Sequence, residues 1–301
     1  MNPTVAEALP VISLVMVGFL LKIIRVIKTE DGPLLSRLIL NVTLPAVIFL
    51  SVSRADVEPL SLGLLALCSF LICLILRVLS GGITKWLKLE PYIAGVIILG
   101  SMVMNVGAFM FPVIQTVYGQ EGVSRLAAFD VGNSLMSSGY GFYLATCFGD
   151  KSPCGYMNSI KKVAALPILW AVLLGLVVNL VGFNLPTFMI KMLTPVSAAN
   201  TPLAMITLGV FVNFKFPRWK LMVLTVFLRM GFGFLIGQAI VLLFNLQGLD
   251  RVIVTMGSAV PIGMVPMVYA ASEGMDTELA AACISLSIII GVIITPLLLT
   301  I

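Results

Sequence analysis

The sequence contains no histidine, and only 10% of its 301 residues are charged. The absence of histidine excludes Ser-His-Asp hydrolysis, histidine-ligated haem and histidine proton relays. The five cysteines show no metal-ligand spacing, and four of them, Cys68, Cys73, Cys147 and Cys283, fall inside apolar segments. This placement favours packing of small side chains over metal binding. We therefore expect neither a metal centre nor a bound cofactor.

Apolar residues, in contrast, are in large excess. They make up 60% of the chain, and the mean hydropathy is +1.13. One soluble core cannot bury so much apolar surface, so the chain is expected to lie in a lipid bilayer. A spanning helix needs ~20 apolar residues, and the composition supplies about nine or ten such helices with no remainder for a soluble domain. Residues Met1–Glu7 lack a basic flank and a cleavage pattern, which predicts a retained first helix.

Charge clusters and Pro/Gly turns divide the chain into ten candidate spanning helices, which predicts an all-α polytopic membrane protein. Their spans are Ala8–Val26, Leu34–Ser53, Leu60–Leu79, Pro91–Tyr118, Gly122–Phe148, Ile160–Val181, Pro186–Phe211, Trp219–Leu246, Leu249–Ala271 and Thr277–Thr300.

The basic residues orient these helices. Thirteen of the 18 Lys and Arg residues fall at loops and helix ends on one side, and four, Arg54, Arg125, Lys191 and Arg251, fall on the other. The positive-inside rule then places both termini outside a plasma membrane, or an inner membrane in a bacterium. The net charge of +5 thus reflects membrane topology, and no nucleic-acid partner is expected.

The predicted helices form two halves of five, residues 1–150 and 151–301, and the fourth helix of each half contains helix-breaking proline. An odd number of crossings per half turns the second half upside down relative to the first. The expected architecture is therefore two inverted five-helix repeats with broken, crossing fourth and ninth helices.

The two breaks supply the candidate substrate site. Irregular backbone at membrane depth survives only where it is buried or lines a polar cavity, and half-helices beginning there present partial positive charge to a carboxylate. The candidate residues are Asn105, Gly107 and Pro112 in the first break, and Pro261, Ile262, Gly263 and Pro266 in the second. A single kinked helix whose asparagine satisfies a neighbouring carbonyl is the alternative, but paired breaks favour a site.

Two buried charges add a second hypothesis. Asp130 is the only acidic residue deep in a predicted helix, where an isolated charge costs ~2.5–3.5 kcal/mol. It begins a polar stripe that continues through Asn133, Ser134, Ser137, Ser138 and Gly141. Arg229 is the matching cation in the eighth helix. The two groups either meet, or Arg229 attracts an anion while Asp130 exchanges H⁺ or Na⁺. A static ion pair is the remaining alternative.

These motifs resemble the auxin efflux carrier family, which includes plant PIN carriers and bacterial relatives. The resemblance rests on Asn105 with Pro112, on Pro261-x-Gly263-x-Val265-Pro266-x-Val268, and on Leu38–Ala46 around Pro45, and it covers essentially the whole chain. The large hydrophilic loop of the plant carriers is absent, since only residues 149–158 fill its place. Ile262 stands where the plant carriers have glutamine, which favours an organic anion in general over auxin itself.

The resemblance implies a fold related to bile-acid sodium symporters. It implies a scaffold of helices one, two, six and seven, and a transport unit of helices three to five and eight to ten. It further implies an elevator-like motion, a homodimer assembled through the scaffold, and substrates such as indole carboxylates or the dicarboxylates malate and malonate.

The three rival classes of function are an intramembrane enzyme, a channel and a sodium-coupled symporter. An intramembrane aspartyl protease needs a second buried acid, and a prenyl transferase needs paired Asp-rich motifs, and the sequence has neither. A channel is disfavoured because the pseudo-symmetry lies within one chain. A sodium-coupled symporter of the bile-acid type is left open, because only the ion dependence of uptake separates it from an organic anion carrier.

Overall fold

The computed structural model describes residues 3–54, 59–151, 161, 164–214 and 218–299. These residues form helices and connecting turns, with a single isolated β-bridge and no strand among them. The prediction of an all-α protein is confirmed.

The chain before the first break contains α1 (Pro3–Ile23), η1 (Thr29–Asp31), α2 (Gly32–Leu38), η2 (Ile39–Thr43), α3 (Leu44–Val52), α4 (Pro59–Trp86) and α5 (Pro91–Met102). It continues with η3 (Val106–Met110), α6 (Phe111–Ser134), η4 (Leu135–Tyr140), α7 (Gly141–Phe148), α9 (Pro167–Leu180), α10 (Thr187–Ala198) and α11 (Asn200–Phe211). The last elements are α12 (Trp219–Val226), η5 (Phe227–Phe232), α13 (Gly233–Leu243), α14 (Gly248–Ala259), α15 (Val265–Glu273) and α16 (Thr277–Leu298). A kink at Gly119, where φ is +57°, divides α6 into two helices.

Six helical stretches of the described chain are long and apolar enough to cross a membrane: Val5–Ile23, Thr29–Val52, Ser61–Trp86, Thr187–Phe211, Trp219–Leu243 and Thr277–Leu298. Two shorter apolar helices, Pro91–Met102 and Pro167–Leu180, accompany them. The molecule is therefore a multi-pass membrane protein, whereas the ten-span layout stays a prediction.

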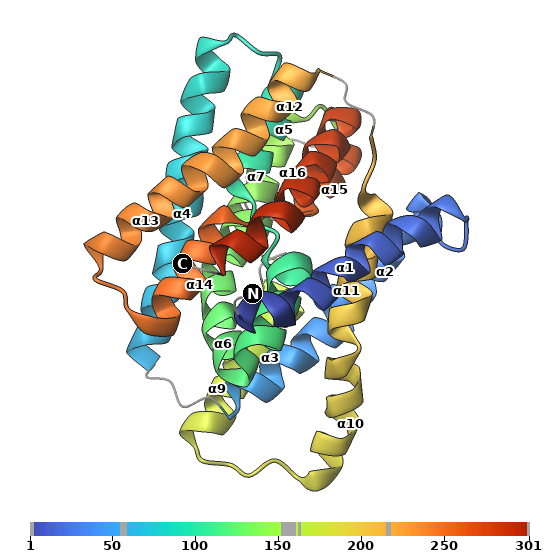
Figure 1. The fold of residues 1–301 in the computed structure, drawn as a ribbon. Coiled ribbons are helices and arrows are strands. Elements are labelled where there is room, and N and C mark those ends of the chain that lie inside the picture. Colours follow the sequence, from blue (N-terminus) through green and yellow to red (C-terminus); the bar gives the residue numbers. More distant parts are fainter. Residues whose placement is uncertain (1–2, 55–58, 152–160, 162–163, 215–217, 300–301) are drawn as a thin grey trace.

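The helices pack in two groups (Figure 1). In one group α1 packs along α11, and α3 packs against α9 and α10. In the other, α4 packs against α5, α6, α13 and α14, and α12 packs against α5 and α16. Glycine allows the α1–α11 backbones to touch, since a Cβ at Gly18 would collide with the Ile206 carbonyl and one at Gly209 with the Val15 carbonyl.

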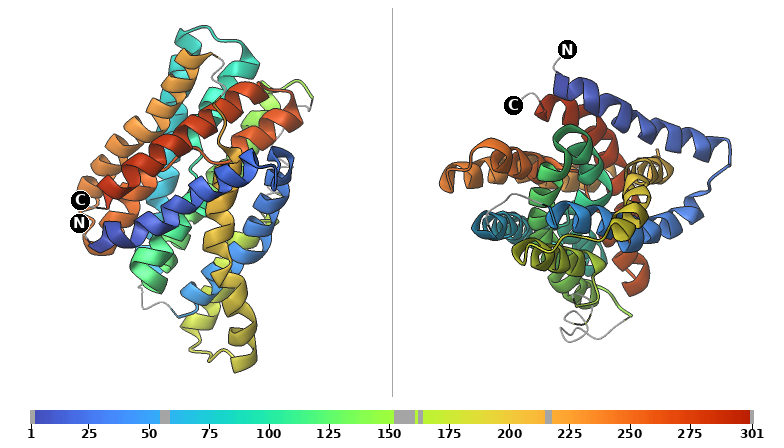
Figure 2. Two further views of the ribbon diagram at one scale, coloured as in Figure 1. Left: turned by 45° about the vertical axis from the view of Figure 1, so that its right-hand side comes forward. Right: turned by 90° about the horizontal axis from the view of Figure 1, so that it is seen from below.

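The beginning of α1 and the end of α16 lie close together in both views of Figure 2, and these two helices pack against each other. The first and last helices of the described chain are therefore neighbours.

The cysteines follow the sequence interpretation at three positions. Cys68, Cys73 and Cys283 are buried free thiols, as expected for core-filling side chains. Cys147 takes part in a disulfide, so the interpretation of this residue as a packing thiol is wrong.

Candidate functional site

The first break interrupts the helix that begins at Pro91. Helix α5 ends at Met102, the backbone is extended at Val103 with φ −87° and ψ 123°, and helical structure resumes at Val106. Asn105 occupies the position before the new helix, as predicted for a residue at the break. Pro112 was expected to cause the break but lies seven residues farther on, in the first turn of α6. The π-helical segment η3 joins α6 without interruption, so the prediction that Pro112 marks the break is wrong.

The second break interrupts the helix that begins at Gly248. Helix α14 ends at Ala259, Val260 is extended, and α15 begins at Val265. Pro261 lies within the unwound stretch, where its missing N–H breaks no helical bond. Pro266 lies in the first turn of α15, a position where proline fits because the amide has no intrahelical partner.

The two unwound stretches cross and pair with each other. Met104 and Ile262 form an antiparallel bridge. The Asn105 N–H donates to the Pro261 carbonyl at 2.9 Å, and the Gly263 N–H donates to the Val103 carbonyl at 3.1 Å. The Asn105 side-chain amide also donates to the Ile262 carbonyl at 3.3 Å. Each break therefore satisfies backbone groups that the other leaves without a helical partner.

Side chains from two neighbouring helices hold the bridge residues. The Asn133 Oδ1 accepts from the Met104 N–H at 3.1 Å, and its Nδ2 donates to the Met104 carbonyl at 3.4 Å and to Asp130 Oδ1 at 2.8 Å. On the other side, Ser287 Oγ accepts from the Ile262 N–H at 3.1 Å. Ser287 was not predicted, although a buried serine within the apolar run Ile284–Ile288 was a signal that could have found it.

Arg229 lies where α5 and α14 end at the two breaks. Its side chain is fully buried, its Nη1 donates to the Ser101 carbonyl at 3.4 Å, and its Nη2 donates to the Ser258 carbonyl at 2.5 Å. Ser101 and Ser258 belong to the last turns of α5 and α14, where helix carbonyls carry partial negative charge. One guanidinium therefore caps the C-terminal ends of both helices.

This placement differs from the predicted meeting of Arg229 with Asp130. The ion pairs of the described residues join Arg125 to Glu121 and Asp250, and Arg218 to Asp276. Asp130 is instead bonded to Asn133. Each charge is thus compensated separately, Asp130 by a side-chain amide and Arg229 by helix carbonyls.

A cavity of about 210 Å³ opens beside the crossing. Five of the predicted site residues line it, namely Asn105, Gly107, Asp130, Asn133 and Gly263, whereas Pro112, Pro261, Ile262, Pro266 and Arg229 do not. Sequence reasoning missed the contributions of α2, η2 and the start of α9, which supply Ser36, Ile39, Leu40, Asn41, Leu166, Pro167 and Ile168. The serines of the Asp130 stripe, Ser134, Ser137 and Ser138, also line it.

The cavity combines one carboxyl group with two helix N-termini. Asp130 is the only ionisable side chain among its lining residues. Gly107 and Ala108 lie in the first turn of η3, and Met264 and Val265 lie at the start of α15. Because the first amides of a helix lack intrahelical acceptors, these two starts offer N–H donors and partial positive charge to an anion.

Irregular helix geometry is concentrated around this site. Four π-helical segments occur in the described chain: η2, η3, η4 and η5. The first three supply cavity-lining residues, and η5 carries Arg229. Such turns are rare and are frequent at functional sites, which supports assigning function to this crossing.

Two glycines at the crossing provide a matched test. A Cβ at Gly263 would lie 2.8 Å from Val103 Cγ1 and 2.9 Å from the Met104 carbonyl oxygen, so Gly263→Ala is expected to separate the bridged backbones and to lower the melting temperature. A Cβ at Gly107 would lie 3.2 Å from the tip of Leu44, which can move, so Gly107→Ala should melt close to wild type. Thermal unfolding of both purified variants checks the contrast. Equal melting temperatures would contradict it.

Comparison with known proteins identifies the family of this chain. The family model described as "Membrane transport protein" matches residues 3–150 and 156–299. The chain belongs to this family, that of the auxin efflux carriers. An uncharacterized transporter of Methanothermobacter thermautotrophicus is 32% identical over 297 residues, which cover 96% of this chain and 95% of that protein.

Two further relatives of the auxin efflux carrier type are also transporters by name. An uncharacterized transporter of Methanocaldococcus jannaschii is 28% identical and covers 95% of each chain. The uncharacterized transporter YfdV of Escherichia coli K12 is 23% identical over 213 residues, 68% of this chain and 67% of that protein. The protein is thus a member of a membrane transport family.

Proposed function

We propose that this protein is a secondary transporter of small organic anions, and that the substrate carboxylate binds in the cavity at the helix crossing. The two helix starts that line the cavity carry the proposal, because they place N–H donors and partial positive charge around one space. The amide of Asn105 adds a hydrogen-bonding side chain next to them.

The size of the cavity favours a small substrate. Clefts that hold drug-sized ligands measure ~300–1,000 Å³. The crossing cavity, at about 210 Å³, suits a dicarboxylate such as malonate or malate, or a compact indole carboxylate. A bile acid, with four fused rings, is disfavoured, and so is the alternative of a bile-acid-type symporter.

Asp130 supplies a reason for coupling to H⁺ or Na⁺. A substrate carboxylate in the same cavity would be repelled by an ionised Asp130, and the repulsion is strong because Asp130 is buried, where charges interact more strongly than in water. A proton or sodium ion held by Asp130 removes this repulsion. Binding of the cation and the anion is therefore expected to be cooperative.

The mechanism that we propose is elevator-type alternating access. The two packing groups support it, because α1, α2, α3, α9, α10 and α11 would form the scaffold and α4 to α7 with α12 to α16 the transport unit. Within this proposal each unit combines helices from both inverted repeats, residues 1–150 and 151–301, and a homodimer forms through the scaffold. We further propose a plasma-membrane location, or an inner-membrane location in a bacterium, with both termini outside.

Counterflow in proteoliposomes tests the proposed function. We expect saturable exchange of radiolabelled malonate, with uptake that varies with external pH or sodium concentration. Asp130→Asn should remove that dependence, because a neutral amide needs no cation beside the substrate, while the exposed Glu278→Gln control should keep it. Ohmic currents without saturation would overturn the carrier assignment. Full, unchanged cation dependence in Asp130→Asn would overturn the coupling role alone.

A further inference from the structure

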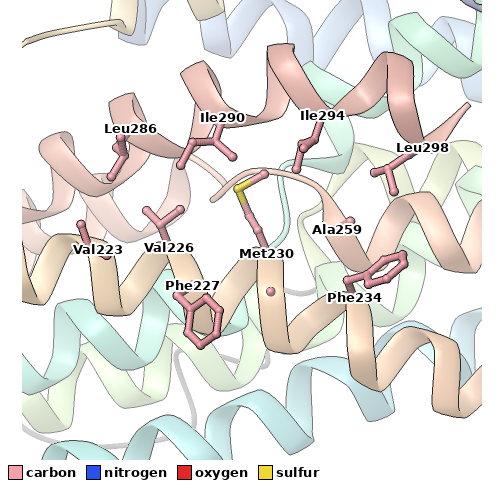
Figure 3. A pocket seen from close by; sticks show the side chains of 11 residues that line it. Val223, Val226, Phe227, Met230, Phe234, Ala259, Leu286, Ile290, Ile294 and Leu298 are labelled. Carbon is pink, nitrogen blue, oxygen red and sulfur yellow. The ribbon is translucent and has the colours of Figure 1, made fainter.

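An apolar groove lies between α12, η5, α13 and α16, and it shares no lining residue with the crossing cavity. It has a volume of about 540 Å³, and all of its lining residues are apolar. From α16 come Leu286, Ile290, Ile294 and Leu298, one in every four residues, and they face Val223, Val226, Phe227, Met230 and Phe234 (Figure 3). Helix α16 packs more closely against α12 than against η5 or α13, which leaves the groove open between the two rows.

The apolar surface around the groove is exposed, as expected for a surface that faces hydrocarbon. Phe227 on one wall is 57% exposed. Ile293 and Leu235, next in sequence to the lining residues Ile294 and Phe234, are 64% and 59% exposed, and all of these residues belong to helices long enough to span a membrane. An apolar cavity offers water no hydrogen-bond partner and stays dry. In a bilayer its natural occupant is therefore an apolar chain.

The dimensions and the charge at one end identify the class of ligand. From Val223 to Phe234 the groove runs about 17 Å along the helix at ~1.5 Å per residue, close to the ~15 Å depth of one leaflet. One turn before Val223 lie Trp219, which is 60% exposed, and Lys220, whose Nζ is 5.8 Å from the Trp219 ring centroid. Trp and Lys at a helix end are typical of the headgroup region, and Lys there attracts anionic lipid.

We propose that this groove binds one acyl chain of an anionic phospholipid, with its headgroup at Lys220. The bound chain would contact Ala259, the last residue of α14, next to Ser258, which accepts the hydrogen bond of Arg229. A lipid in the groove therefore supports the end of the broken helix from outside. This inference does not depend on which substrate the crossing cavity binds.

Native mass spectrometry of the purified protein tests the site, with phosphatidylglycerol and phosphatidylcholine of identical acyl chains added in detergent. We expect a preference for phosphatidylglycerol of about fivefold, the ratio expected for one lysine near the headgroup. Lys220→Gln should remove this preference, while Lys191→Gln, exposed on α10, should leave it unchanged.

A second pair of variants distinguishes the effect of filling the groove from the effect of adding a large side chain anywhere on α16. Ile294→Trp places the indole in the groove and should abolish the retained lipid, whereas Ile293→Trp adds the same bulk on the outward face and should not. Equal lipid retention by the two tryptophan variants would overturn the proposal. If Ile294→Trp keeps its lipid but changes the ratio of monomer to dimer, the lipid proposal is wrong. The occupant of the groove would then be a second copy of the chain.

Discussion

Replacing Arg229 by methionine is expected to abolish transport and to lower the melting temperature of the purified protein. The substitution removes the donors that cap the Ser101 and Ser258 carbonyls, and it leaves two helix C-termini facing each other with no cation between them. Hydrogen bonds of charged groups are worth ~1.5–3 kcal/mol each. Methionine avoids the cost of desolvating a buried guanidinium, and this gain offsets part of the loss of the two bonds. A loss of about 2–4 kcal/mol in the free energy of unfolding follows.

Two variants control for this result. Arg251→Met removes an exposed arginine from α14, one of the two helices that Arg229 caps, and should melt like wild type. Arg229→Lys keeps the charge, but a single ammonium lacks the forked donors that reach two carbonyls, so it should give an intermediate melting temperature. Differential scanning fluorimetry and proteoliposome uptake measure the two effects. If Arg229→Met and Arg251→Met have the same melting temperature, the capping role of Arg229 is wrong.

Asn133→Ala is expected to be similarly severe. This single side chain bonds both backbone groups of Met104 and one oxygen of Asp130, so alanine leaves three buried polar groups without that partner. An unsatisfied buried polar group costs ~1–3 kcal/mol, which predicts a loss of about 3 kcal/mol or more and a collapse of the cavity wall. Uptake should fall to background because Asn133 lines the cavity.

Ser287→Ala is the matched control for Asn133→Ala, since it removes one hydrogen bond from the other bridge residue, Ile262. It should lower the melting temperature less and retain measurable uptake, because Ser287 does not line the cavity. Thermal melts and initial uptake rates of the two variants test this order. The reverse order would show that the bridge depends mainly on the α16 side.

The predicted breaks show how far local sequence reasoning reaches. Proline placed the second break correctly at Pro261, which lies in the unwound stretch, because a missing amide disfavours regular helix there. The same reasoning failed at Pro112 and Pro266, because each ring lies in the first turn of an α-helix beyond the break. A proline shows that a helix is disturbed nearby, but the neighbouring backbone determines where it unwinds.

The buried charges show a different limit. Their rarity in apolar helices was visible in the sequence, and it correctly predicted that Asp130 and Arg229 are buried and compensated. Their partners were not visible, because a carbonyl at a helix end carries no signature in the residue type. Ser101, 128 positions away from Arg229, became its partner only because two helices end at that place.

The sequence by itself determined that this chain is an all-helical membrane protein of a transport family, that two helices are broken, and that Asn105 and Gly263 lie at those breaks. These features follow from hydrophobicity and from proline and glycine geometry, which act over a few residues. Only the tertiary structure decided that the breaks pair through Met104 and Ile262, that Arg229 caps two helices, and that η2 and α9 complete the cavity. The physical reason is that these contacts join distant segments, and the packing of whole helices sets their distances.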